Sequence, residues 1–161
     1  MENRVELLRK FIDGMVQSNP QREWWFVERH MFSVSNFAAM LAMKRSQNAE
    51  IAVMIGLLHD IHTLLTDSPK NHAELGSMKA REILLNLKIV SNDELEIICN
   101  AIKNHCSKNV IQDAYSELAK DADVLSHYFT NPSLPVIDNE KVRLRKLLDE
   151  FAVNPVISEK T

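Results

Sequence analysis

Glycine is scarce in this chain, with 3 residues among 161, where an average usage of about 7% would give roughly 11. Few glycines leave few tight turns, which disfavours a dinucleotide-binding Rossmann domain or a β-sandwich. Cysteine is scarce too, and 2 residues exclude a disulfide framework and indicate a reducing compartment. The longest uncharged apolar-rich run, residues 31–43, is too short to cross a bilayer, which takes about 20 residues. We therefore expect a cytoplasmic protein with no membrane partner.

Excess positive charge is also missing. The formal net charge is -3 and the sequence pI is about 6.1, so charge gives no reason to expect DNA or RNA binding. A length of 161 residues favours one domain. We predict a single domain over residues 1–161, and the sequence leaves a homo-oligomer open.

The apolar residues recur with helical spacing almost throughout, and no alternating stretch is long enough to predict a strand. The sequence therefore predicts an all-α bundle. Aromatic side chains of the second helix are expected in the core and not on a ligand platform: Trp24, Trp25, Phe26, Phe32 and Phe37. Seven helices are expected. The first is ended by Pro20, and the fifth runs from its cap Ser91 to residue 105. The others cover residues 22–46, 49–65, 71–86, 113–129 and 138–151.

All 6 histidines lie between His30 and His127. Among them, His59 and Asp60 are adjacent near the end of the most apolar predicted helix. Burying a carboxylate costs several kcal/mol unless it is paired or binds a metal. The pair could simply form a hydrogen-bonded helix end, which would be a structural role. Alternatively, it could bind a metal, which would be a functional role.

Other candidate ligands have plain interpretations when taken singly. His30 could be a core histidine, and His72 could simply open a helix. His105 would complement the dipole at a helix C-terminus. Asp121 and Asp123 flank Ala122 on the sixth predicted helix, where a solvated face suits Asp121 better than Asp123.

Together these residues fall on five predicted helices and offer imidazole nitrogens with carboxylate oxygens. Such a set suits one or two divalent ions (Mn, Fe, Ni, Co, Zn or Mg) better than a metal that seeks thiolates. Neighbouring residues on a helix differ by about 100°, so Asp60 could share one ion with His59 or bridge two ions. The candidate metal ligands are His30, His59, Asp60, His72, His105 and Asp123.

The order of His30, His59-Asp60 and Asp123 resembles the HD superfamily of metal-dependent phosphohydrolases. The resemblance covers about residues 22–130, with a separate C-terminal helix over about 138–151. It implies a compact, multi-helix, HD-domain-like bundle. It also implies one metal bound by these four residues and a second bound by positions matching His72 and His105, with Asp60 bridging.

Two segments depart from the family pattern. His62 and Thr63 stand where many members have Gly and Lys, so a phosphate contact from that lysine is missing. Residues 106–108 read Cys-Ser-Lys, where the branch that hydrolyses dinucleoside tetraphosphates has a Thr-rich, Gly-containing segment. The Gly-Tyr-Pro signature of the cyclic-dinucleotide branch is absent from the sequence.

The resulting hypothesis is hydrolysis of a phosphate ester or anhydride of a nucleotide-like small molecule through a metal-bound hydroxide. Asp60 and Asp121 are the catalytic candidates, Asp121 as an orienting or acid/base group. Lys70 and Lys108 are candidates for phosphate contact, although each also fits a solvated surface lysine. Three alternatives remain open: a regulatory domain that binds a nucleotide without turnover, a di-iron oxygenase, and a purely structural bundle.

Overall fold

A computed structural model describes residues 3–18 and 25–155. These residues form helices and no strand, so the all-α prediction is confirmed for them. The predicted helix end at Pro20 and helix start at Arg22, together with Trp24 and the Trp25 side chain, lie outside the described residues. The elements are α1 (Arg4–Gln17), α2 (Trp25–Lys44), α3 (Ala49–Leu58), α4 (Ile61–Thr66), α5 (His72–Leu87), α6 (Asn92–Asn104), α7 (Ala114–Thr130), the 3-10 turn η1 (Asp138–Glu140) and α8 (Lys141–Glu150).

Side-chain caps fix where several helices begin. The Asn48 side chain accepts hydrogen bonds from two backbone N–H groups at the start of α3. Ser91 and Glu94 form the predicted capping box at the start of α6. Asp113 caps α7 in the same way as Asn48 caps α3. These caps explain why the predicted starts agree with the structure to within a residue or two.

The predicted single helix over 49–65 is wrong, because the chain breaks between α3 and α4 at His59 and Asp60. Asp60 leaves helical geometry, with φ -109° and ψ 20°. The apolar pattern continues through Ile61 and Leu64 beyond the break, so periodicity gave no sign of it. The last predicted helix also changes: residues 138–140 form the 3-10 turn η1, and only 141–150 are α-helical.

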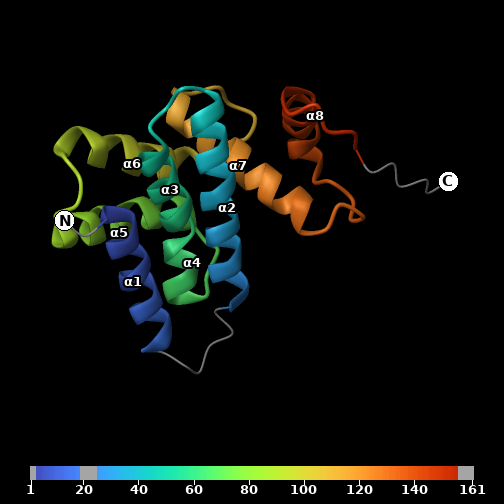
Figure 1. Cartoon of the computed structure of the whole chain (residues 1–161). Coiled ribbons are helices and arrows are strands. Elements are labelled where there is room, and N and C mark those ends of the chain that lie inside the picture. The colour runs from blue at the N-terminus through green and yellow to red at the C-terminus, as the bar shows by residue number, and fades with distance from the viewer. Residues whose placement is uncertain (1–2, 19–24, 156–161) are drawn as a thin grey trace.

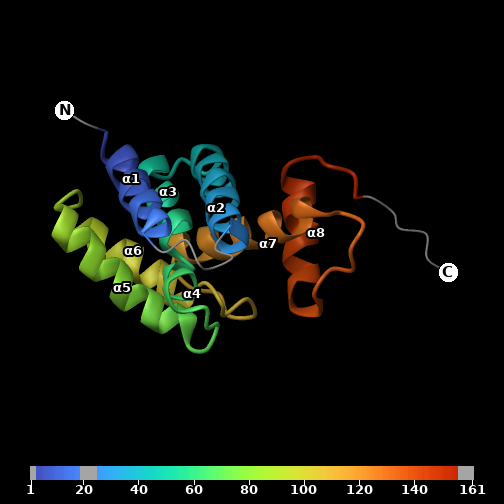
Figure 2. The ribbon, with the colours of Figure 1, turned by 90° about the horizontal axis from the view of Figure 1, so that it is seen from below.

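Helix α3 lies at the centre of the bundle. Figure 1 shows α1, α3 and α2 side by side, and Figure 2 shows α5 and α6 as a pair along the side of α1 and α3. Figure 2 shows α7 leading away from this group to α8, which lies at the far side of the molecule. The stretch Ala49–Thr66 is long and apolar enough to cross a membrane, but 56% of it is buried in the bundle, as expected for the core helix of a soluble protein.

Helices α2 and α3 approach each other closely at Gly56. A Cβ atom added to Gly56 would lie 2.6 Å from the backbone nitrogen of Ser35 on α2, and closer still to its Cα atom. Only a residue without a side chain fits this approach. The same two helices carry His30 and His59, so their close packing sets the distance between those imidazoles.

Candidate metal centre

The fold brings four of the candidate ligands together from α2, the α3–α4 junction and α7. The Nε2 atoms of His30 and His59 lie 3.2 Å apart. Asp123 places its Oδ1 atom 3.0 Å from Nε2 of His30. The Oδ2 atom of Asp60 lies 3.9 Å from His30 Nε2 and 3.5 Å from His59 Nε2. These distances are those of neighbouring ligands around a common centre.

A second pair of imidazoles faces the other oxygen of Asp60. His72 opens α5 and His105 follows the end of α6, and their Nε2 atoms lie 3.2 Å apart. The Oδ1 atom of Asp60 is 3.4 Å from Nε2 of His72 and 3.7 Å from Nε2 of His105. One carboxylate therefore lies between two histidine pairs and turns one oxygen toward each.

Backbone carbonyls fix the tautomer of three of these histidines. In His59, His72 and His105, Nδ1 lies 2.7–2.8 Å from the carbonyl oxygen three residues earlier. A carbonyl oxygen can only accept, so each Nδ1 carries a proton and donates it. In its neutral form each ring presents the Nε2 lone pair toward Asp60. This backbone anchoring is the arrangement that orients metal-ligating histidines.

The donor set fits a divalent cation on electrostatic grounds. Within the described residues, the buried Oδ1 atom of Asp60 accepts no hydrogen bond. It faces the Nε2 atoms of His72 and His105, so when these rings are neutral, acceptors meet acceptors at 3.4 and 3.7 Å, and a cation between them would turn repulsion into attraction. Nitrogen and carboxylate ligands suit Mn, Fe, Co, Ni or Zn.

Burial and charge shift the ionisation of this cluster. Burial lowers the pKa of His59, and it lowers the pKa of His105 to about 3, so both stay neutral. Burial alone would raise the pKa of Asp60, but the surrounding histidines lower it overall. Asp123 behaves similarly: burial opposes ionisation, but the Lys108 ammonium and neighbouring histidines hold its pKa well below the usual range. Neutral imidazoles and ionised carboxylates are the ligand forms that metals bind.

His127 joins the site, although the sequence analysis assigned it no role. Its ring stacks on His30 with centroids 5.0 Å apart, and its Nε2 atom lies 3.4 Å from Oδ1 of Asp123. Its Nδ1 atom lies 3.1 Å from the buried carboxylate of Glu140, which raises the pKa of His127. The signal was available, because His127 follows Asp123 by four residues on a helix and shares its face.

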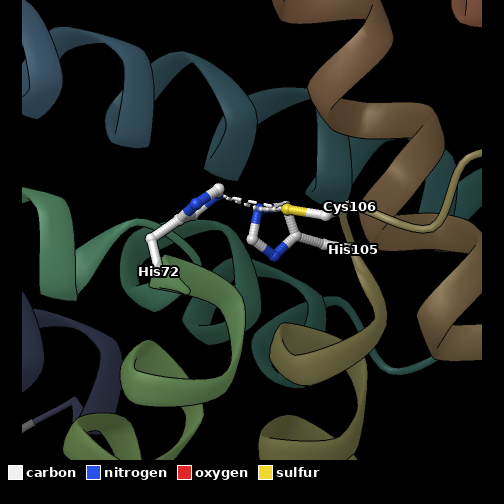
Figure 3. A group of neighbouring side chains, drawn as sticks. All are labelled: His72, His105 and Cys106. Atoms are coloured by element: carbon white, nitrogen blue, oxygen red, sulfur yellow. Dashed lines mark hydrogen bonds between the residues drawn. The ribbon is translucent and has the colours of Figure 1, made fainter. Parts of the chain in front are cut away.

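Cys106 is the second residue that sequence reasoning missed. Its Sγ atom lies 3.1 Å from Nε2 of His72 and 3.3 Å from Nε2 of His105 (Figure 3). A hydrogen bond with the Cys106 side chain raises the pKa of His72 to about 9. The available signal was its position directly after His105, which places it at the same helix end.

The remaining predicted site residues lie in different places. Asp121 is not brought to the cluster: it pairs with Arg45 at 2.7 Å and with Arg143 at 2.6 Å. Lys108 donates to the Asp123 carboxylate and, at 3.0 Å, to the carbonyl of His105, so it is a buried neighbour of the site and not a solvated lysine. Lys70 is exposed in the turn before α5.

A largely apolar cavity of about 550 Å³ opens beside His30 and His127. Its far wall is the segment between α7 and α8, including Leu134 and Pro135. Phe26 lines its edge and is 66% exposed, so the prediction that this ring lies in the core is wrong. The ring instead lies where α2 begins, at the mouth of the cavity. Phe32 and Phe37 pack against the two hydrophobic core clusters, as predicted.

An all-α bundle that gathers imidazoles and carboxylates from separate helices defines a class of metal-binding domain. The sequence model of the HD domain matches residues 27–128, so the chain belongs to the HD domain family of metal-dependent phosphohydrolases. Ribonuclease Y of Treponema denticola is 32% identical over 122 residues, which cover 75% of this chain. The chain spans about a fifth of that relative's length, since the match covers 22% of it. No solved structure matches the chain.

Proposed function

We propose that this protein is a divalent-metal-dependent phosphohydrolase that cleaves a phosphate ester or anhydride bond in a nucleotide-like substrate, and that it works in the cytoplasm. The strongest support for the proposal is the position of the Asp60 carboxylate. It lies between two imidazole pairs, and its buried Oδ1 atom lacks a hydrogen-bond partner among the described residues. A centre of this composition, held rigidly by backbone carbonyls, is suited to hydrolysis because it needs no side-chain nucleophile.

Each residue then has a separate task. A divalent ion held there makes a nucleophile available from water near neutral pH and draws charge from the phosphoryl oxygens. His30, His59, Asp60 and Asp123 would hold one ion, and Asp60 with His72 and His105 would hold a second. Lys108 fixes the orientation of Asp123 through its ion pair and adds positive charge at the edge of the site.

The cavity favours a substrate with an apolar part. Its walls are mainly apolar, while the groups facing the metal centre are His30 and His127. The faces of a nucleobase are planar and apolar and stack on rings such as Phe26. We infer that the base enters this cavity while the phosphate reaches the histidines.

A second substrate class has support from the comparison with ribonuclease Y, whose name describes cleavage of RNA. An RNA phosphodiester is a phosphate ester, so the same centre could act on a single-stranded end. The net charge of -3 argues against extensive backbone contact. We therefore favour the small nucleotide and treat the oligoribonucleotide as the rival.

The experiment is a metal analysis followed by a substrate panel. Protein purified without chelator is assayed for bound metal, then incubated with nucleoside mono- and triphosphates and a short oligoribonucleotide in Mn, Co, Ni or Mg. Asp60→Asn should lower turnover by about 100-fold or more, since loss of even an outer partner of a ligand costs 10–100-fold. Asp93→Asn, an exposed carboxylate on α6, is the matched control.

Three results would contradict the proposal. Turnover that survives Asp60→Asn unchanged would exclude a metal-centred hydrolysis. Tight nucleotide binding without product would instead indicate a regulatory domain. Bound iron with oxygen uptake and no phosphate release would indicate an oxygenase.

A further inference from the structure

The cluster of His72, His105 and Cys106 has the geometry of a ligand set for one ion. Figure 3 shows the Cys106 side chain directed at both rings, which come from the start of α5 and the end of α6. The Sγ atom and the two Nε2 atoms are separated pairwise by 3.1, 3.2 and 3.3 Å. Nitrogen and sulfur ligands bound to one tetrahedral ion at 2.0–2.3 Å lie roughly 3.3–3.6 Å from each other, so these atoms need to move apart by only a few tenths of an ångström.

Hydrogen bonding alone leaves this cluster short of protons. Both rings use their Nδ1 proton on a backbone carbonyl, so in the neutral form of each ring Nε2 presents a lone pair. A single thiol proton on Cys106 can serve only one of them. The Oδ1 atom of Asp60, which faces both rings, is buried and accepts no hydrogen bond from the described residues. With both rings neutral, four lone-pair atoms therefore converge around the single thiol proton.

We propose that Cys106 binds as a thiolate to the ion held by His72, His105 and Asp60, giving a second site with two nitrogens, one oxygen and one sulfur. On binding, the S–H bond breaks, a sulfur–metal bond forms, and the proton passes to solvent, which the exposed Cys106 side chain reaches. The inference rests on the proposed function, because it assumes that the metal centre forms.

The sulfur determines which metal the second site prefers. Thiolate ligands favour Zn²⁺, Fe²⁺ and Co²⁺ and disfavour Mg²⁺ and Mn²⁺, which prefer oxygen. Four protein ligands of this kind are the usual shell of Zn²⁺. The site formed by His30, His59 and Asp123 has no sulfur, so the two halves of the centre should differ in metal preference. We therefore assign Zn²⁺ to the sulfur-containing half.

Cobalt titration tests this directly, because a thiolate bound to Co²⁺ gives a near-ultraviolet charge-transfer band that imidazole and carboxylate ligands do not give. Metal-stripped full-length protein is titrated with CoCl₂, and bound cobalt is counted by equilibrium dialysis. The wild type should bind cobalt and develop the band. Cys106→Ser should bind cobalt at the first site without the band. Cys99→Ala removes the other cysteine, which is buried in the core, and should keep the band.

Two further measurements do not depend on colour. Zn²⁺ should protect Cys106 from alkylation by iodoacetamide, with mass spectrometry locating the label. In competition dialysis, Cys106→Ser should lose about tenfold or more of its preference for Zn²⁺ over Mn²⁺ at one site. Circular dichroism confirms that the variant is folded, which is expected at an exposed position.

The outcomes separate this inference from the proposed function. Cobalt binding without a band in the wild type, or a band that survives Cys106→Ser, would overturn the thiolate assignment and leave the histidine and aspartate centre intact. Failure of the wild type to bind any metal would overturn both. Zinc binding equal in wild type and Cys106→Ser would also overturn the assignment.

Discussion

The close approach of α2 to α3 at Gly56 predicts the effect of adding one methyl group there. In Gly56→Ala, the new Cβ would lie 2.6 Å from the backbone nitrogen of Ser35 and closer to its Cα. Carbon atoms pack at about 3.5–4.0 Å, so α2 and α3 must separate by about 1 Å. Overpacking of this kind costs about 1–3 kcal/mol, and the gain of about 0.5–1 kcal/mol from replacing a helical glycine offsets only part of it. Since backbone atoms cannot rotate away, we expect the upper end of this cost, about 3 kcal/mol, and a net loss of about 2 kcal/mol.

The consequences extend to the metal centre. Moving α2 from α3 widens the 3.2 Å gap between His30 and His59, so metal affinity should fall along with stability. Thermal unfolding should show a midpoint about 4–8 °C lower, and dialysis should show weaker metal binding. Gly14→Ala is the matched control: nothing lies within 4 Å of its added Cβ, so it should gain about 0.5–1 kcal/mol and bind metal normally. A Gly56→Ala protein as stable as the wild type would refute the packing argument.

Three further substitutions test other parts of the structure. Ser91→Ala removes the α6 capping box and should lower the free energy of unfolding by about 1 kcal/mol in urea titrations; no change would contradict the cap. Lys120→Met removes a fully buried ammonium that donates to the Val110 carbonyl and to two side chains. The free energy of unfolding should therefore fall by roughly 1–3 kcal/mol, and backbone hydrogen exchange should become faster in residues 106–113. Asp121→Asn weakens the ion pairs to Arg45 and Arg143, so the free energy of unfolding should fall by roughly 1–3 kcal/mol while the metal content stays at the wild-type level. Loss of bound metal in Asp121→Asn would show that this carboxylate belongs to the centre after all.

Helix positions were predictable from the sequence because their signals are local. Caps such as Asn48 and Ser91 satisfy the first backbone N–H groups of a helix and can be read within four residues. The break at Asp60 could not be predicted in this way, since it depends on contacts with α2, α5 and α6 and interrupts an apolar pattern that otherwise continues. The single-domain prediction for residues 1–161 stays a prediction.

The candidate site was predictable only as far as residue types and their order allowed. Asp121 and Asp123 look alike in sequence, two residues apart on one helix, and the packing of α8 separates them. Arg143 on α8 takes Asp121 into an ion pair, while Asp123 on the other side of α7 faces His30. The sequence already favoured Asp123 as the metal ligand, but no local pattern contains the position of α8, so the ion pairs that hold Asp121 away from the centre required the tertiary structure.

The helix break explains how one short dipeptide can serve two metal positions. In a continuous helix, His59 and Asp60 would point about 100° apart. With the chain broken between α3 and α4, the His59 ring stays anchored to the backbone of α3 while Asp60 turns one oxygen toward His30 and the other toward His72. The departure from helical geometry therefore lets one carboxylate face both histidine pairs, as a bridge between two ions would require. A substitution that restored the helix through this junction should abolish binding at both positions together, whereas loss of His72 alone should spare the first.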